Sequence, residues 1–358
     1  MHADCFASSY GEATLSFRAA CVDRNIPLSP YRHPARGPGG KALQTSVALL
    51  GAANARRILI VNCGTHGVEG LAGSGCIRSW LAQEPASLPG DMSVLLIHLL
   101  NPWGTAWRRR QTEGNIDLNR NFVDFTHTQP VNAYYETLRR ALAPACAAQD
   151  SWDHVQRRIA AFRSAHGEEA LAQAVCRGQY ADPHGVGFGG LEAAWSNTTF
   201  RSILARHAAR ASDVVFIDLH TGLGPFGHGT LISTDDNHTA ELARARAWFG
   251  ASIVALKDDR QNMPYDIHGD ICTAARSMLP NARVVALTLE FGTFQFDEFL
   301  SLQVRDCWSR QENRADEPAF RDRLENFFYP RDRRWREMAA SRALDVFEQA
   351  ITGLRDCP

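Results

Sequence analysis

The sequence lacks features that would point to several classes of protein. Its 38 Lys and Arg nearly balance 39 Asp and Glu, with a pI near 6.9, so nothing in the charge predicts binding to nucleic acid or to an anionic membrane surface. No apolar run approaches the roughly 18 residues of a membrane-spanning helix, and the start has neither the basic nor the apolar region of a secretory signal. We therefore expect a cytoplasmic protein with small or neutral partners. Its oligomeric state is left open.

Motifs for several kinds of site are also missing. The nine cysteines include no C-x-x-C pair, and their scatter is typical of reduced thiols rather than of disulfides or a cysteine-type zinc site. There is no Gly-x-Ser-x-Gly segment of a serine hydrolase. The G-x-G-x-x-G match at residues 222–227 contains Pro225 and precedes a strand-like run, so we do not expect a dinucleotide there.

What the chain does have is ample core material and alternating elements. Its 358 residues are 45% hydrophobic, enough for one large α/β domain. The patterns predict strands at 45–50, 58–63, 93–100, 214–219, 229–233 and 284–289, and helices at 8–25, 70–81, much of 131–212, and 324 onward. We predict loops at 27–40 and 179–190 and a turn at 101–104.

This alternation predicts a three-layer α/β/α fold. A twisted mixed central sheet would be covered by helices on both faces. No repeat or linker divides the chain, so we expect a single domain over 1–358 with a mostly helical insertion around 131–212.

Three of the strand-like runs stop on residues that bind metals or work beside them. The run at 58–63 leads into His66 and Glu69, the run at 214–219 into His220, and the run at 284–289 into Glu290. Since ligands in open α/β sheets bind beyond the carboxyl ends of the strands, these side chains are expected to converge. Two histidines and one glutamate around an ion leave a position open for water, as in catalytic zinc sites.

The His-x-x-Glu spacing alone is weak evidence. It recurs at His166/Glu169 and at His238/Glu241, in helical or polar stretches with no strand ahead of them, and we interpret those pairs as solvated surface. A lone histidine after a strand, such as His220, is more often a core residue. The prediction of a metal site therefore depends on the two segments coming together.

A basic segment at 107–122 lies between the first two of these runs. A run of arginines is usually a solvated face. Amide hydrolysis, however, needs a cation where oxyanion charge develops and a forked donor where a carboxylate docks, and arginine suits both. One interpretation of Glu290 is a structural, buried carboxylate that pairs with an arginine. Beside a metal-bound water, Glu290 could instead accept a proton from that water and pass it on.

Together these residues resemble the zinc carboxypeptidase superfamily. The matching elements, in order, are His66-x-x-Glu69, Asn101-Pro-x-Gly104, an arginine, residues 117–122 (Asp-Leu-Asn-Arg-Asn-Phe), His220 and Glu290. The segments at 66–70 (His-Gly-Val-Glu-Gly) and 178–190 are similar to those of an uncharacterised bacterial branch. The matched core covers roughly residues 45 to 295.

The resemblance implies a role for each matching residue. His66, Glu69 and His220 would bind one Zn²⁺ ion, and Glu290 would be the general base. The other implied roles are orientation of His66 by Asp117, substrate carboxylate binding by Asn119 and Arg120, and polarisation of the scissile carbonyl by Arg110 or, in a shifted register, Arg109. A mobile tyrosine expected ahead of the catalytic glutamate is assigned to Tyr265, which could equally be an ordinary loop aromatic.

The expected activity is hydrolysis of an amide bond next to a free carboxylate. The substrate would be a peptide, as for a metallocarboxypeptidase, or an N-acyl amino acid, as for a deacylase of the aspartoacylase or desuccinylase kind. A spacious cleft would favour peptides and a closed one acyl amino acids. A non-catalytic binding protein is the third alternative, against which the intact ligand set and Glu290 argue.

Overall fold

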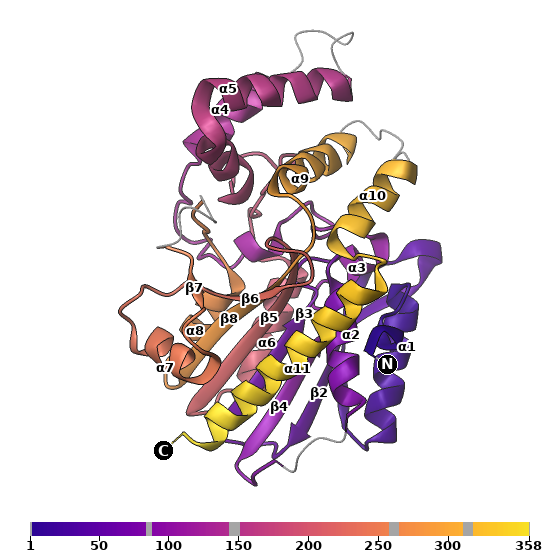
Figure 1. Cartoon of the computed structure of the whole chain (residues 1–358), viewed down its shortest axis with the longest axis vertical. Coiled ribbons are helices and arrows are strands. Elements are labelled where there is room, and N and C mark those ends of the chain that lie inside the picture. The colour runs from indigo at the N-terminus through magenta and orange to yellow at the C-terminus, as the bar shows by residue number, and fades with distance from the viewer. Residues whose placement is uncertain (1, 84–87, 143–150, 258–264, 311–317, 358) are drawn as a thin grey trace.

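The computed structural model describes residues 2–83, 88–142, 151–257, 265–310 and 318–357. Its strands are β1 (Leu28–Arg36), β2 (Ala42–Gly51), β3 (Arg57–Cys63), β4 (Met92–His98), β5 (Asp213–Gly222), β6 (Gly229–Ser233), β7 (Val254–Ala255) and β8 (Arg283–Gly292). They form one sheet in the order β1-β2-β4-β3-β5-β8-β6-β7. Strands β4, β3, β5 and β8 are parallel, whereas β1-β2-β4 and β8-β6 are antiparallel neighbours. The predicted mixed central sheet is confirmed (Figure 1).

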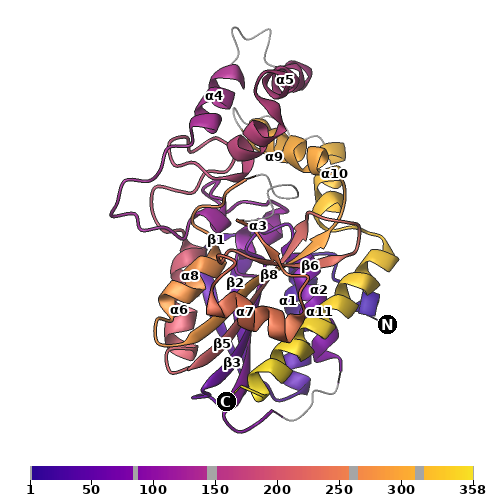
Figure 2. The same cartoon turned by 60° about the vertical axis from the view of Figure 1, so that its left-hand side comes forward.

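Helices cover both faces of the sheet. They are α1 (Tyr10–Asp23), α2 (Gly70–Leu81), α3 (Pro102–Trp107), α4 (Ala133–Leu142), α5 (Trp152–Cys176), α6 (Trp195–His207), α7 (Ala240–Phe249), α8 (Ile271–Met278), α9 (Phe296–Arg310), α10 (Pro318–Phe328) and α11 (Arg333–Arg355). Helices α1, α2, α7 and α11 pack on one face, and α6 and α8 on the other (Figure 2). Within the described part of the chain, no helix has both the length and the apolar character needed to cross a bilayer.

The central strands are apolar along their whole length because both of their faces are buried. In β3, Leu59 and Val61 belong to the core under α2 and α11, while Ile58 and Ile60 belong to the core under α6. Successive side chains of a strand point to opposite faces, so a strand covered on both sides needs a continuous apolar run. This requirement explains why the sequence pattern located the central strands within a few residues.

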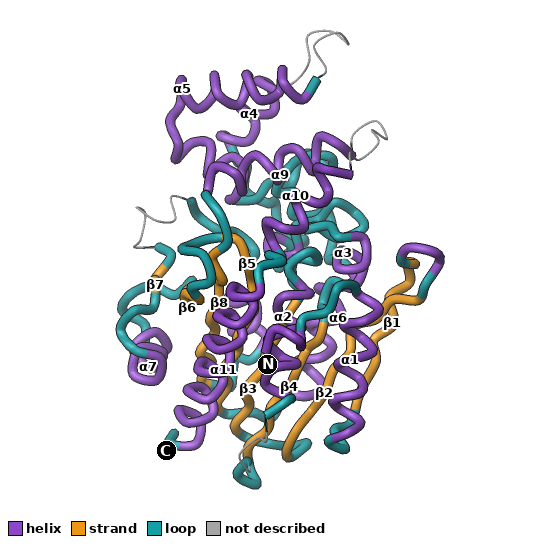
Figure 3. Tube along the Cα trace, turned by 45° about the vertical axis from the view of Figure 1, so that its right-hand side comes forward, coloured by secondary structure: helices purple, strands orange, loops and turns teal. Residues whose placement is uncertain are grey.

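A third apolar cluster lies beyond the carboxyl ends of the parallel strands. It is formed by α4, α5, α9 and α10, which gather at one end of the molecule (Figure 3). Helix α6 does not belong to it, since Phe200 of α6 packs against Phe216 of β5 with ring centroids 5.5 Å apart. Of the helices between residues 131 and 212, α4 and α5 stand over this end of the sheet and α6 covers its face.

The loop predicted at 27–40 is wrong, because residues 28–36 form strand β1. The prolines Pro30 and Pro34 argued against a strand. In the structure β1 is the first strand of the sheet and pairs with β2 alone. Proline is tolerated at such an edge, where one side of the strand forms no ladder.

Two other local predictions also need correction. The segment predicted as a turn at 101–104 starts helix α3: Asn101 is its N-cap, with a side chain that accepts from the Gly104 N–H at 2.9 Å, and Pro102 takes the first position. The helix predicted from residue 324 onward is two helices. Pro330 interrupts it, and Asp332 caps α11 by accepting from the Trp335 N–H.

Candidate metal centre

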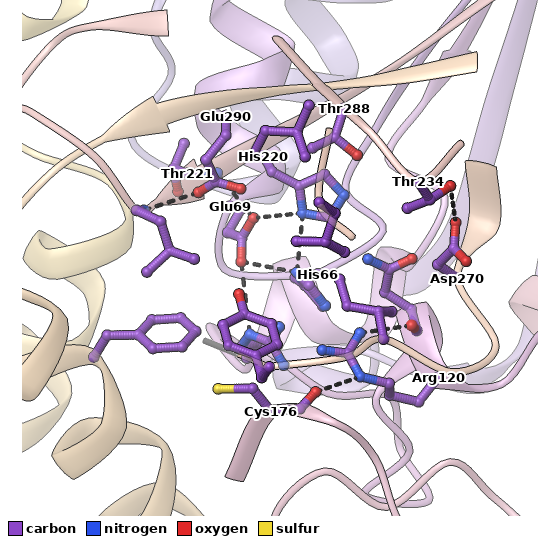
Figure 4. Close-up of a pocket in the computed structure, with 18 of the residues that line it drawn as sticks. His66, Glu69, Arg120, Cys176, His220, Thr221, Thr234, Asp270, Thr288 and Glu290 are labelled. Carbon is purple, nitrogen blue, oxygen red and sulfur yellow. Dashed lines mark hydrogen bonds and ion pairs between the residues drawn. The ribbon is translucent and has the colours of Figure 1, made fainter. Parts of the chain in front are cut away.

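The parallel strands deliver four predicted site residues to one end of the sheet. His220 of β5 lies directly opposite Glu290 of β8 in the strand register. His66 follows β3 in a short turn, and Glu69 is the N-cap residue of α2. All four side chains are buried, and Figure 4 shows them around one pocket. The convergence expected from the strand ends is present in the structure.

Close backbone approach fixes the turn that carries His66. The Gly67 N–H donates to the Arg110 carbonyl at 3.0 Å. A Cβ atom on Gly67 would lie 2.1 Å from the carbonyl carbon of Gly104, so only glycine fits at this contact. The turn after β3 is thereby attached to the segment that presents Arg110.

His66, Glu69 and His220 present their ligand atoms to a common point. The three atoms lie within 4.8 Å of one another. The two Nδ1 atoms are 3.2 Å apart, and the Glu69 carboxylate lies 2.9 Å from the Nδ1 of His66 and 3.2 Å from the Nδ1 of His220. These residues could hold one metal ion, at the positions that the sequence predicted.

A buried carboxylate stands behind each imidazole. The Nε2 of His66 is 3.0 Å from Oδ1 of Asp117, and the Nε2 of His220 is 2.5 Å from Oδ2 of Asp218. A carboxylate only accepts, so each Nε2 carries a proton, and a ring that binds a metal ion through Nδ1 would be the neutral Nε2–H tautomer. This carboxylate–histidine pairing is the usual support of a metal-binding imidazole.

The charge of the cluster fits a divalent cation. Three carboxylates, those of Glu69, Asp117 and Asp218, are joined by hydrogen bonds and ion pairs to the two histidines and to one guanidinium, that of Arg110. With neutral histidines, the network has a formal charge of −2, and its Nδ1 and carboxylate lone pairs face one another. Buried charge of one sign is costly unless it is compensated. A divalent ion among these atoms would supply that compensation.

The pKa values of His220 and Asp117 reflect the charged groups around each of them. Burial opposes a charge on His220, but Asp218 and Glu69 raise its pKa well above the usual value. Burial would also raise the pKa of Asp117, yet the charges of Arg110, Arg120 and His66 hold it well below the usual range. The cluster therefore attracts a cation, which is a proton in the absence of a metal ion.

The three consecutive arginines at 108–110 point to different places. Arg110 is buried, lines the pocket and donates to Asp117 at 2.5 Å. Its Nε is 3.7 Å from Glu69 and has no hydrogen-bond partner within the part of the chain that the structure describes. Arg109 pairs with Asp306 of α9 at 2.5 Å and is not among the residues that line the pocket. The structure therefore puts Arg110, rather than Arg109, beside the candidate metal ligands.

Arg120 is a buried cation that pairs with no described carboxylate. Its Nε donates to the carbonyl of Cys176 and its Nη1 to the carbonyl of Asn119, each at 2.7 Å. Asn119 accepts from the Ile271 N–H at 2.9 Å. Both Asn119 and Arg120 line the pocket, and Arg120 is labelled in Figure 4. A buried guanidinium held by neutral carbonyls retains its full charge for an anionic ligand.

Glu290 also lines the pocket. Its Oε1 accepts from the Leu223 N–H at 2.9 Å, and among the described residues no other group bonds to this carboxylate. Burial raises the pKa of Glu290 to about 7. The arginine pairing that would have made Glu290 a purely structural residue is not found within the described ranges.

Tyr265 lies in the wall of the same pocket. It is buried, and its ring is nearly parallel to that of Phe296, with centroids 6.4 Å apart. Residues 258–264 before it, which the sequence analysis included in the same loop, lie outside the described residues.

The pocket is small and covered. Its volume is about 60 Å³, room for a few water molecules. Phe299 and Gln303 of α9 form part of its wall, and Cys176 at the end of α5 forms another part. A larger pocket of about 660 Å³ adjoins it and shares the lining residues Thr234, Leu256, Ile267 and Asp270.

Asp218 and its partners were not predicted from the sequence. Asp218 lies two residues before His220 in a strand, so both side chains point to the same face. An aspartate inside an otherwise apolar run, at that spacing from a candidate ligand, was the available signal. The partners, Asn62 and Thr65, are polar residues at and after the end of β3 and gave no comparable signal.

Comparisons with known proteins place the chain in a family but assign no activity. A family model described as "Protein of unknown function (DUF2817)" matches residues 6–342. No curated protein shows significant sequence similarity to the chain.

Several solved structures are similar to this chain at low sequence identity. Bovine thrombin-activatable fibrinolysis inhibitor, in complex with a tick carboxypeptidase inhibitor, is 12% identical with a TM-score of 0.47, covering 97% of both chains. A metallo-carboxypeptidase from Burkholderia cenocepacia is 11% identical (TM-score 0.43, 94% of this chain and 69% of that one). A succinylglutamate desuccinylase/aspartoacylase from Rhodobacter sphaeroides is 12% identical (TM-score 0.38, 79% and 65%). Likeness at this level says nothing about substrate.

The ligand set can be tested by metal content. We expect the wild-type protein to bind one divalent ion per chain, and His66→Ala to lose it, because two remaining ligands cannot hold the ion in a buried site. The measurement is metal per protein by mass spectrometry after dialysis. His166→Ala is the matched control, since His166 belongs to the same His-x-x-Glu spacing but is exposed on α5. Equal metal content in both variants would contradict the assignment.

Proposed function

We propose a function for this chain, which belongs to the DUF2817 family of proteins of unknown function, from the chemistry of its pocket. The chain is a metal-dependent hydrolase that cleaves an amide bond next to a free carboxylate, as a metallocarboxypeptidase does. One observation carries this proposal. A single pocket is lined by the His-Glu-His ligand set, by the carboxyl group of Glu290 and by the buried guanidinium of Arg120, which pairs with no described carboxylate. In this proposal the chain acts as a single domain, and the insertion around 131–212 closes one side of the pocket through Cys176.

The metal ion that we propose is zinc. Two imidazoles and one carboxylate are the ligand set of several catalytic zinc sites, and softer cysteine ligands are absent from the cluster. When bound, the ion would act as a Lewis acid towards the scissile carbonyl and towards water. Asp117 would hold the imidazole of His66 in the ligand tautomer.

Glu290 is the proposed general base. Its Oε1 is held by the Leu223 N–H, and its Oε2 has no hydrogen-bond partner among the described residues. This oxygen can take a proton from the attacking water and later pass it to the leaving amine. A carboxylate whose pKa is raised by burial is a stronger base than one in solvent, which suits this task near neutral pH.

The two buried arginines have separate proposed roles. Arg120, with Asn119, anchors the free carboxylate of the substrate through charge-assisted hydrogen bonds. Arg110 lies beside Glu69 and stabilises the negative charge that develops on the carbonyl oxygen. Its Nε, which is buried and has no hydrogen-bond partner among the described residues, is a donor available for that oxygen. Tyr265 is proposed to contact the substrate from the pocket wall, and Arg109 to hold α9 rather than the substrate.

The pocket volume favours a second candidate, a deacylase for N-acyl amino acids. A volume of about 60 Å³ leaves little space for a polypeptide within this pocket itself. The same residues would perform the same chemistry on a short acyl group. The two candidates differ only in the length of the acyl part that the pocket admits.

The role of Glu290 is tested by Glu290→Gln. The amide keeps the shape and the hydrogen bond from Leu223 but cannot accept the proton, so kcat should fall by about 10²–10⁴-fold. Metal content should stay at the wild-type level, which separates lost chemistry from a lost site. A variant with wild-type kcat would reject Glu290 as the base.

The role of Arg120 is tested by comparing each substrate with its carboxamide. The wild-type protein should prefer the carboxylate by about 10–100-fold in kcat/KM, the worth of one or two charge-assisted hydrogen bonds. In Arg120→Met this preference should vanish. If the variant retains the full preference, another group anchors the carboxylate.

Substrate length distinguishes the two candidates. The test is a series with one constant C-terminal amino acid and an acyl part that grows from acetyl to a tripeptide. A deacylase should lose kcat/KM steadily as the acyl part grows, whereas a carboxypeptidase should hold or gain. Hydrolysis of none of these compounds by the metal-loaded protein would contradict both candidates.

A further inference from the structure

Asp218 is a fully buried carboxylate that, among the described residues, bonds to the imidazole of His220 and to no Lys or Arg side chain. It lies in β5 with no exposed surface. Its Oδ2 is 2.5 Å from the Nε2 of His220, and its Oδ1 accepts from the Nδ2 of Asn62 at 2.7 Å. The Thr65 hydroxyl lies 2.9 Å from both oxygens. Burying a carboxylate in this way is costly unless its bonds serve a defined arrangement.

The partners of Asp218 connect the two segments that carry the histidines. Asn62 is the residue opposite Asp218 in the parallel pairing of β3 and β5. Thr65 directly precedes His66. The Asp218 carboxylate therefore contacts His220 of its own strand and also Thr65, which precedes His66 in the turn after the neighbouring strand β3. Displacement of Asp218 would disturb the distance between the two Nδ1 atoms.

Asp218 differs from Asp117, the carboxylate behind His66. Asp117 also accepts from Arg110, whose positive charge offsets its own. Asp218 has only neutral donors besides His220, and among the described residues no Lys or Arg pairs with it. Among the described residues, the negative charge of Asp218 is therefore not offset by a guanidinium or an ammonium group, unlike that of Asp117. The two imidazoles consequently have unequal partners, and His220 would be the more electron-rich ligand.

We propose that Asp218 is a positioning residue that fixes His220 in the Nε2–H tautomer with Nδ1 towards the metal ion, and that Asn62 and Thr65 hold Asp218 in place. This assignment rests on the proposed metal site. It adds a role for three residues, Asp218, Asn62 and Thr65, that touch neither the metal ion nor the substrate. They act on the affinity for the ion and on the geometry of one ligand.

The experiment compares Asp218→Asn with Asp213→Asn. Asp213 lies in the same strand, is buried too and pairs with Arg283, but it stands at the opposite end of β5 from the site. In each variant the asparagine side chain keeps the shape of the aspartate and loses its charge. We expect the zinc dissociation constant, measured by competition with a chelator, to rise by about 10–100-fold in Asp218→Asn and to stay unchanged in Asp213→Asn.

Cobalt substitution gives a readout that a loss of stability alone would not change. The visible absorption of bound Co²⁺ reports ligand geometry, so its spectrum should shift in Asp218→Asn and match the wild type in Asp213→Asn. Equal zinc affinities and equal spectra in Asp218→Asn and the wild type would overturn the assignment. A wild-type protein that binds neither ion would instead reject the proposed metal site, and with it this role.

Thr65 provides a second pair of variants in case Asp218→Asn does not fold. Thr65→Val removes the hydroxyl that reaches Asp218, whereas Thr65→Ser keeps it. The valine variant should bind zinc several-fold more weakly than the serine variant, because only the serine variant can still donate to Asp218. Equal zinc affinity in the two variants would count against the proposed support of Asp218.

Discussion

The constraint on which the site depends is the burial of negative charge at the carboxyl end of the sheet. Glu69, Asp117 and Asp218 lie within one hydrogen-bonded network that contains a single guanidinium. Two imidazole lone pairs face the same point as the Glu69 carboxylate. In a medium of low dielectric constant such a cluster is unstable unless a cation occupies its centre. The stability of this cluster in the folded protein therefore depends on the ion that the groups would bind.

Sheet register and close packing place these groups. Parallel pairing sets His220 of β5 opposite Glu290 of β8 and Asn62 of β3 opposite Asp218 of β5, so each of these two strand pairs contributes one pair of polar residues. The contact between Gly67 and Gly104 brings the turn after β3 against helix α3. A larger residue at position 67 would not fit at that contact. The geometry of the site is thus a consequence of backbone packing, with side chains added at fixed positions.

The helices above the sheet form part of the pocket wall. Arg110 faces the pocket, whereas the neighbouring Arg109 pairs with Asp306 of α9, the helix whose Phe299 and Gln303 line the pocket. The backbone segment that carries Arg110 therefore also holds α9, so this side of the pocket wall depends on the ion pair between Arg109 and Asp306.

The sequence by itself determined the central strands, helix α2 and the identity of the residues that meet at the strand ends. Those features depend on local periodicity and on the rule that parallel strands end at one edge, which a single sequence displays. Other features were decided only by tertiary structure. Edge pairing made a strand of 28–36 despite its prolines, backbone contacts turned Arg110 rather than Arg109 into the pocket, and cross-strand bonds gave Asp218 its partners. The enclosure of the pocket likewise came from helices distant in the chain. Each of these outcomes depends on which groups lie side by side in space, and no local pattern in a sequence encodes that.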